Sequence, residues 1–162
     1  VITFGNMKES ALIVKQMREM GMDQWYLGSD RMVGEEFLNI IGANNTKIVG
    51  AYPYDPASEN PAYLKFKNDF KNRFDENAET YAAHAFDGLN MIIDAIEKAG
   101  LNRALIRDKL AAMRDYEGVT GKKDFDAVFS NRTPAKLAIL KNGKFEYYGF
   151  EEIFSEEFDA VK

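Results

Sequence analysis

The stretch WYLGSDR, residues 25–31, predicts a short apolar strand that ends in a turn and a carboxylate. Before it, Val1–Phe4 predicts a buried strand, and apolar residues three and four positions apart predict an amphipathic helix over 7–20. Asn6 is placed to cap the start of that helix, and Gly21 is placed to end it. Strand, helix and strand in this order form a β-α-β unit, which is typical of a parallel sheet. The sequence therefore predicts an α/β fold.

The rest of the chain alternates helical and extended patterns in the same way. Helices are predicted over 34–41, 61–74, 79–99 and 102–113, and strands over 47–52, 116–121, 136–141 and 144–148. Asn142-Gly143 joins the last two strands with a residue pair typical of two-residue hairpins. The predicted buried stripe of the 79–99 helix consists of Tyr81, Ala85, Leu89, Ile92, Ile96 and Ala99. The acidic and aromatic tail, 151–162, is interpreted as a final helix.

Composition excludes several classes of function. The 162 residues suffice for one domain with a core, and the net charge of −5 argues against a nucleic-acid partner. No apolar run approaches the roughly 20 residues that span a bilayer. The absence of cysteine excludes disulfides, thiol catalysis and Cys-ligated metal, and leaves both the cytosol and the periplasm open. Because Val1 stands inside the first predicted strand, we expect a piece of a longer protein.

The sequence carries no recognisable catalytic or metal-binding motif. His84 is the single histidine and lies inside a predicted helix, so a structural role is favoured over a catalytic or metal-binding one. The G-x-S-x-G elbow, the P-loop and the G-x-G-x-x-G fingerprint are all missing. We therefore expect no enzyme, no metal site and no cofactor.

Asp30 is the first candidate for a binding residue. In open α/β sheets, ligands bind beyond the carboxyl ends of the parallel strands. The β-α-β unit is expected to bring Asn6 and Asp30 to one rim, where the backbone N–H groups of Met7 and Lys8 open a helix. A carboxylate there suits an ammonium group. The alternative is that Asp30 is an ordinary turn residue after Gly-Ser.

Four segments together resemble a known family. They are YLGSD, VGAYPYDPASENPAYLKF, YAAHAFDGLNMIIDAIEKAG and YEGVTGKKDFD. The chain resembles, over about residues 1–148, the branched-chain amino-acid-binding proteins of ABC transporters, which are type I periplasmic binding proteins of the leucine/isoleucine/valine-binding class. It looks like the C-terminal portion of such a protein, and a complete member is roughly twice as long.

This resemblance implies a partial α/β protein with parallel-sheet, three-layer lobes. Residues 1–52 would belong to the second lobe, 53–133 to the returning part of the first lobe, and 134–162 to the second lobe and a C-terminal tail. Three of the four prolines lie in 53–61, which independently predicts a connection between lobes. Hinge positions are expected at Tyr52, Pro53, Thr133 and Pro134.

The resemblance also implies a function. The expected role is the periplasmic or extracytoplasmic solute-binding component of an ABC importer, lipid-anchored in some relatives, which closes on an amino acid or similar small polar solute and meets the ABC permease. The alternative is a ligand-sensing module of a receptor or regulator, and an α/β enzyme is less favoured. Without the early first-lobe strands, we expect residues 53–133 to lack much of their sheet and to be rearranged, chain-swapped with another copy, or completed by a separate chain.

Site residues carry over one by one. In amino-acid binders of this family an acidic residue after the strand that matches 25–27 takes the α-ammonium group, and that position is Asp30. The position of Asn6 lines the cleft and is often aromatic in the family, so Asn6 argues against an apolar branched ligand side chain. Ser29 and Arg31 are weaker candidates beside Asp30. The family's carboxylate-binding residues lie outside this chain, so the chain holds at most half a site.

Overall fold

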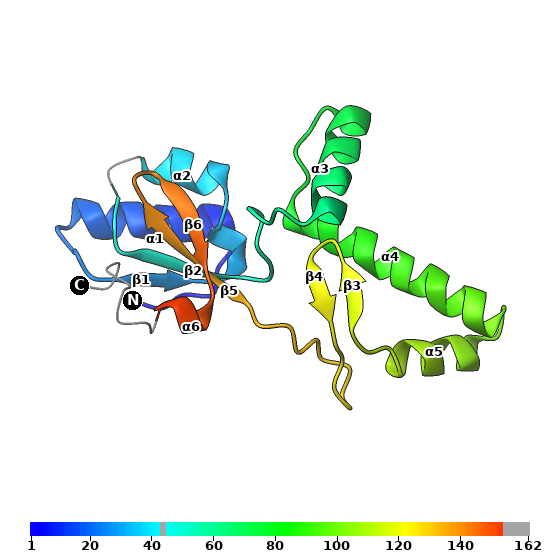
Figure 1. Cartoon of the computed structure of the whole chain (residues 1–162). Coiled ribbons are helices and arrows are strands. Elements are labelled where there is room, and N and C mark those ends of the chain that lie inside the picture. Colours follow the sequence, from blue (N-terminus) through cyan, green and yellow to red (C-terminus); the bar gives the residue numbers. More distant parts are fainter. Residues whose placement is uncertain (43–44, 154–162) are drawn as a thin grey trace. The chain divides into compact units, whose positions relative to one another are not determined.

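The computed structural model describes residues 1–42 and 45–153, and the chain falls into two compact units (Figure 1). Unit 1 comprises residues 1–56 and the chain from Pro134 onward, and unit 2 comprises residues 57–133. The chain thus passes from unit 1 to unit 2 and back.

Unit 1 is built on a four-stranded mixed sheet. Its order is β1 (Tyr26–Gly28), β2 (Ile48–Tyr52), β5 (Lys136–Lys141) and β6 (Lys144–Tyr148). β1 and β2 run parallel, whereas β5 runs antiparallel to both β2 and β6. Asn142 and Gly143 have φ of 49° and 75°, the backbone of a primed two-residue turn, so the predicted hairpin is confirmed. The predicted α/β class holds, and the hairpin explains why the sheet is not parallel throughout.

One strand pair fixes where the chain leaves unit 1. Tyr52, the last residue of β2, is paired with Lys136, the first residue of β5. The connection into unit 2 and the connection back from it therefore start and end side by side on the sheet.

The helices of unit 1 share its core with the strands. They are α1 (Met7–Glu19), the 3-10 turn η1 (Asp30–Met32), α2 (Glu35–Ile41) and α6 (Phe150–Ile153). α1 and α2 pack against each other, and the Phe37 ring of α2 lies 6.1 Å from the Phe145 ring of β6. Gly21 and Gly42 end α1 and α2 with φ of 74° and 84°, values that favour glycine. The predicted tail helix lies outside the described residues beyond Ile153.

The expectation of a buried first strand is wrong. Residues 1–4 touch β1 through one parallel bridge, Ile2 to Leu27, and the Thr3 amide donates to the Leu27 carbonyl at 2.9 Å. Ile2 and Phe4 are 71% and 90% exposed, because the described chain sets nothing over their side chains. The parallel β-α-β connection itself is present.

Unit 2 is mainly helical. It contains α3 (Pro61–Phe74), α4 (Thr80–Ala99), α5 (Arg103–Ala111) and the antiparallel pair β3 (Tyr116–Gly118) and β4 (Gly121–Lys123). Asn60 and Asn102 cap α3 and α5, since their side chains accept bonds from backbone amides of the first turns. Across residues 57–133, all of them described, this two-stranded pair is the whole sheet.

The predicted helix at 79–99 is confirmed as α4, but its buried side is not the predicted one. The buried residues are Ala83, Asp87, Met91 and Ala95. Leu89 and Ile92 of the predicted stripe are 60% and 43% exposed. Both sides of the helix are apolar, and unit 2 covers only one of them. A helix that is apolar all round is usually buried all round, so α4 presents an uncovered face.

Candidate functional site

Two turns meet at one end of the unit 1 sheet. The Ser29 hydroxyl, after β1, donates to the Gly5 carbonyl, before α1, across 3.2 Å. This bond brings the start of α1 and the start of η1 together, so that Asn6 and Met7 lie on the same rim as Ser29 and Asp30. The predicted juxtaposition is therefore present in the backbone.

Two glycines decide how Asp30 is held. A Cβ on Gly28 would lie 2.3 Å from the Met32 sulfur, and a Cβ on Gly50 would lie 2.6 Å from Cγ2 of Val33. Any larger residue at these strand positions would force Met32 or Val33 to move, so glycine suits the close packing of η1 on β1 and β2. Met32 and Val33 are buried there, 0% and 9% exposed, and they anchor the turn. Asp30 therefore begins a fixed turn rather than a free loop.

The side chains of the rim are polar and accessible in different degrees. Ser29 and Asp30 are half-buried, whereas Asn6 and Arg31 are exposed. Asn6 occupies the N-cap position of α1, yet its side chain makes no capping hydrogen bond. Its amide is therefore not committed to the helix that it opens.

A buried hydroxyl lies next to this rim. Ser10, in the second turn of α1, is 0% exposed, and its Oγ has no hydrogen-bond partner within the described part of the chain. A Cβ on Gly5 would lie 3.0 Å from this oxygen. The backbone at Gly5 is thus packed directly against the hydroxyl, which leaves little room for a larger residue.

The expected hinge residues lie at the two connections. Tyr52 is 8% exposed, and its ring lies 5.5 Å from that of Tyr54 and 5.3 Å from that of Tyr147. Pro53 follows β2 directly, and the boundary between the units falls between Thr133 and Pro134.

His84 takes part in α4 rather than in a metal site. Its Nδ1 lies 2.8 Å from the Thr80 carbonyl one turn earlier. The part of the chain that the structure describes holds no group of three His, Cys, Asp or Glu side chains suited to a metal ion.

A separate cavity of about 540 Å³ belongs to unit 2. It lies at the ends of α4 and α5 and the start of β3, and its polar lining includes Asp94, Lys98, Lys109, Arg114, Asp115 and Glu117. Lys98 already pairs with Asp94 at 2.6 Å. Burial, with the charges of Asp87 and Asp94, raises the pKa of the Tyr116 phenol at its wall. The mixed charges favour neither an anion nor a cation.

Sequence reasoning found the rim residues but missed what positions them. Gly28 and Gly50 lie in β1 and β2, and glycine is unfavourable in a strand unless another group approaches the backbone closely. These two glycines could therefore have indicated the close packing of η1. Nothing in the sequence indicated that the Ser10 hydroxyl is buried, because a serine in a helix is ordinarily exposed.

Residues 1–143 match the family model described as periplasmic binding protein. The chain is 30% identical to the branched-chain amino acid transporter substrate-binding protein LivJ of Streptococcus pneumoniae, solved with isoleucine, with a TM-score of 0.78. It is 26% identical to the leucine-binding protein LivK of Thermotoga maritima, with a TM-score of 0.79. A Leu/Ile/Val-binding protein homologue of Brucella abortus is 26% identical over 122 residues.

These matches cover most of this chain and a minor part of the relatives. The matches to LivJ and LivK each include 91% of this chain but only 43% of the relative. The Brucella match covers 74% of this chain and 32% of that protein. In the described ranges, none of the helices is both long and apolar enough to cross a bilayer.

Proposed function

Because the chain belongs to the periplasmic binding protein family, we propose that the complete protein is the extracytoplasmic solute-binding component of an ABC importer. This role is supported by two relatives, LivJ, the substrate-binding protein of a branched-chain amino acid transporter, and LivK, a leucine-binding protein. The chain spans less than half of those proteins, so the role belongs to the complete protein, whose partner would be an ABC permease.

The proposed ligand is an amino acid or a similar small polar solute. The observation that carries the proposal is the rim on which the Ser29–Gly5 bond and the two glycines hold a half-buried Asp30. An ammonium group would bind the Asp30 carboxylate, because charge-assisted hydrogen bonds are stronger than neutral ones. Asn6 and Ser29 would offer an amide and a hydroxyl beside it, with the Met7 amide at the helix start.

The two units would be parts of two lobes. We assign residues 1–52 and 134–162 to the second lobe and residues 53–133 to the returning part of the first lobe. Support comes from the division of the chain into units after Pro56 and after Thr133. The uncovered face of α4 would then be the surface on which the rest of the first lobe packs.

The mechanism would be closure of the lobes over the ligand. A ligand that touches both lobes favours the closed form by its additional contacts there. The two connections, one that follows Tyr52 and Pro53 and one that begins at Pro134 after Thr133, would absorb the change. The permease would then distinguish the closed, loaded form from the open one.

The test is a thermal-shift screen of amino acids on the complete protein, with and without Asp30→Asn. A ligand that binds only the folded state raises the melting temperature. Loss of a charged hydrogen bond costs about 1.5–3 kcal/mol, so Asp30→Asn should weaken binding by roughly 10- to 100-fold. Glu36→Gln removes an exposed acid elsewhere in unit 1 and serves as the matched control.

Two outcomes would contradict different parts of the proposal. Undiminished amino-acid binding by Asp30→Asn would remove the ammonium role of Asp30. A complete protein whose melting temperature responds to no amino acid, and only to uncharged solutes, would remove the amino-acid ligand.

A further inference from the structure

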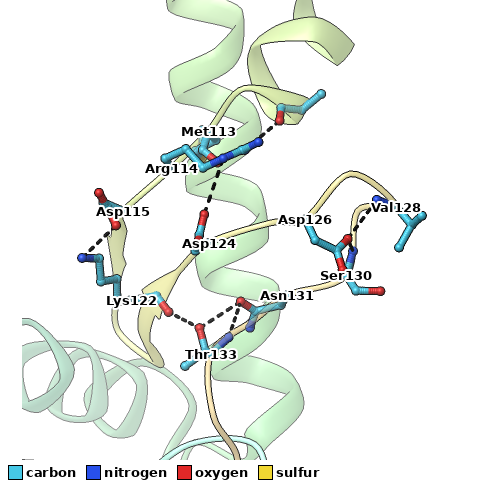
Figure 2. A network of polar contacts seen from close by, with 11 residues as sticks. Met113, Arg114, Asp115, Lys122, Asp124, Asp126, Val128, Ser130, Asn131 and Thr133 are labelled. Carbon is cyan, nitrogen blue, oxygen red and sulfur yellow. Dashed lines mark hydrogen bonds and ion pairs between the residues drawn. The ribbon is translucent and has the colours of Figure 1, made fainter.

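The segment that leads out of unit 2 is folded back onto the β3–β4 hairpin. Figure 2 shows Thr133 beside Lys122 of β4 and beside Asn131. The Thr133 hydroxyl lies within hydrogen-bonding distance of the Lys122 carbonyl and of Asn131 Oδ1, the latter at 2.9 Å. The Thr133 amide also donates to Asn131 Oδ1, at 3.2 Å. Thr133, the last residue of unit 2, is therefore hydrogen-bonded both to β4 and to Asn131.

The residues before Thr133 are fixed in turn. Asp126 Oδ1 accepts the amides of Val128 and Ser130, both at 2.9 Å, and closes a compact loop (Figure 2). The Arg132 amide donates to the Asp124 carbonyl at 2.8 Å. Figure 2 also shows the ion pair of Asp115 with Lys122, 2.8 Å long, which links the residue before β3 to β4. Hydrogen bonds within unit 2 thus continue up to Thr133.

On the other side of the connection, the sheet of unit 1 begins at once. Lys136 opens β5 and pairs with Tyr52 of β2. Only Pro134 and Ala135 lie between Thr133 and Lys136. The pyrrolidine ring fixes φ of Pro134, and a proline also restricts the residue before it to extended backbone. The backbone bonds that neither effect restricts are ψ of Pro134 and the two dihedral angles of Ala135.

The outgoing connection is longer. Tyr54, 6% exposed and stacked on Tyr52, is the last buried residue of unit 1 before the α3 cap at Asn60. The stretch between Tyr54 and Asn60 has more backbone bonds than the return connection. The return connection is therefore the shorter of the two.

From these contacts we propose that Thr133 is a positioning residue that fixes the exit from unit 2 and confines the bend to Pro134 and Ala135. This inference rests on the closure assigned above to the complete protein. If the exit is fixed, the two units sample fewer relative orientations before ligand binds. The protein then loses less conformational entropy when the lobes close.

The test measures the distance between the units without any ligand. In the complete protein, with any cysteine outside these 162 residues replaced by serine, Lys15→Cys on α1 and Glu97→Cys on α4 place one spin label on an exposed position of each unit. Thr133→Val keeps the shape of the side chain and removes the hydroxyl, and it should broaden the distance distribution. Thr133→Ser keeps the hydroxyl and should restore the narrow one. The amide at position 133 keeps Asn131 Oδ1 as its acceptor in Thr133→Val, but the exit should open more often without the hydroxyl. Its exchange should become faster by up to about tenfold, the value of the one net hydrogen bond that the hydroxyl contributes.

A second variant, Pro134→Gly, tests the pivot independently in case Thr133→Val fails to fold. Pro134→Gly leaves the Thr133 bonds in place and frees φ at the pivot, so it should broaden the distribution as well. Ser130→Ala is the matched control, because in the contacts of Figure 2 Ser130 acts through its backbone amide. A distribution for Thr133→Val as narrow as that of the original chain would overturn the role of Thr133, and an unchanged width in Pro134→Gly would overturn the pivot at Pro134. Because no ligand is used, this result does not depend on whether the protein binds an amino acid.

Discussion

Asp87 of α4 and Thr120 of the β3–β4 turn are joined by two hydrogen bonds. The Thr120 amide and hydroxyl both donate to Asp87 Oδ2, at 2.9 and 2.6 Å, and the neighbouring Val119 amide donates to Oδ1 at 2.7 Å. Asp87 is 3% exposed, so its charge is held away from water by these three donors. The turn and the helix are thereby fixed to each other within unit 2.

Asp87→Asn should destabilise unit 2 strongly. In the variant, the NH2 group of the asparagine side chain would replace one carboxylate oxygen and would point at a backbone N–H of the turn. Two donors would then face each other, and both would be buried without an acceptor. The expected loss in the free energy of unfolding is about 2–3 kcal/mol, measured by urea denaturation. Asp94→Asn on the same helix is the control: its ion pair with Lys98 is partly exposed and should contribute only about 0.5 kcal/mol. Similar losses for both variants would mean that burial of Asp87 is unimportant.

Gly118→Ala and Gly88→Ala should change stability in opposite directions. A Cβ on Gly118 would lie 2.4 Å from Asp87 Oδ2, and that carboxylate cannot move without losing its donors. Overpacking of this kind costs about 1–3 kcal/mol. Gly88 lies inside α4 with nothing within 4 Å of such a Cβ, so alanine there should stabilise by about 0.5–1 kcal/mol. A Gly118→Ala chain as stable as the original would show that the carboxylate relocates freely.

Lys123 should make stability rise with pH in the alkaline range. It is 4% exposed, and burial lowers the pKa of its amine from 10.5 despite the opposing charge of Asp87. Between the lowered pKa and 10.5, the unfolded chain binds more protons than the folded one, so the free energy of unfolding increases with pH. Lys123→Met should lack this rise when unfolding is followed as a function of pH.

Lys122 offers the opposite sign as a control. The hydrogen bond with Asp115 raises the pKa of its amine above 10.5, so its stabilisation is present below 10.5 and is lost as pH rises through the raised value. Lys122→Met should therefore remove a fall rather than a rise. The same alkaline profile in both variants would contradict the assignment of the rise to Lys123.

The uncovered face of α4 should behave differently in the 162-residue chain and in the complete protein. Leu89→Gln should change the stability of the 162-residue chain by less than about 0.5 kcal/mol and reduce its self-association, because the side chain is 60% exposed. In the complete protein the same substitution would bury an amide and should destabilise by about 2 kcal/mol. Sedimentation and thermal denaturation measure the two effects. Leu101→Gln, at a residue 94% exposed just after α4, is the control in both proteins.

Local patterns were enough to predict most elements of the fold. The helix boundaries of α1 and α4 and both strands of the Asn142-Gly143 hairpin agree with the sequence within one or two residues. Capping residues, glycines and periodicity act over a few residues, and therefore they are visible in the sequence itself. The rim of Asn6 and Asp30 could be predicted for a related reason, since a β-α-β connection dictates which strand ends meet.

Burial could not be predicted in the same way. Val1–Phe4 and the stripe of Leu89 and Ile92 are apolar in the manner of core residues, yet they are exposed in the described chain. Apolar periodicity indicates that one face of a helix or strand has to pack against another surface. It does not indicate whether that surface is formed by these 162 residues. The position of Asp87 among three donors was likewise invisible, because its partners are more than thirty residues away.

The pairing of Tyr52 with Lys136 has a consequence for how the protein folds. The two residues are more than eighty positions apart, so the sheet of unit 1 cannot be completed until all of unit 2 has been synthesised. Closing so long a loop delays strand pairing, and non-local pairing is the main cause of slow folding in small domains. Unit 2, whose contacts lie within one continuous segment, can reach its native structure first. Newly made chains should then pass through an intermediate in which β1 and β2 still await β5.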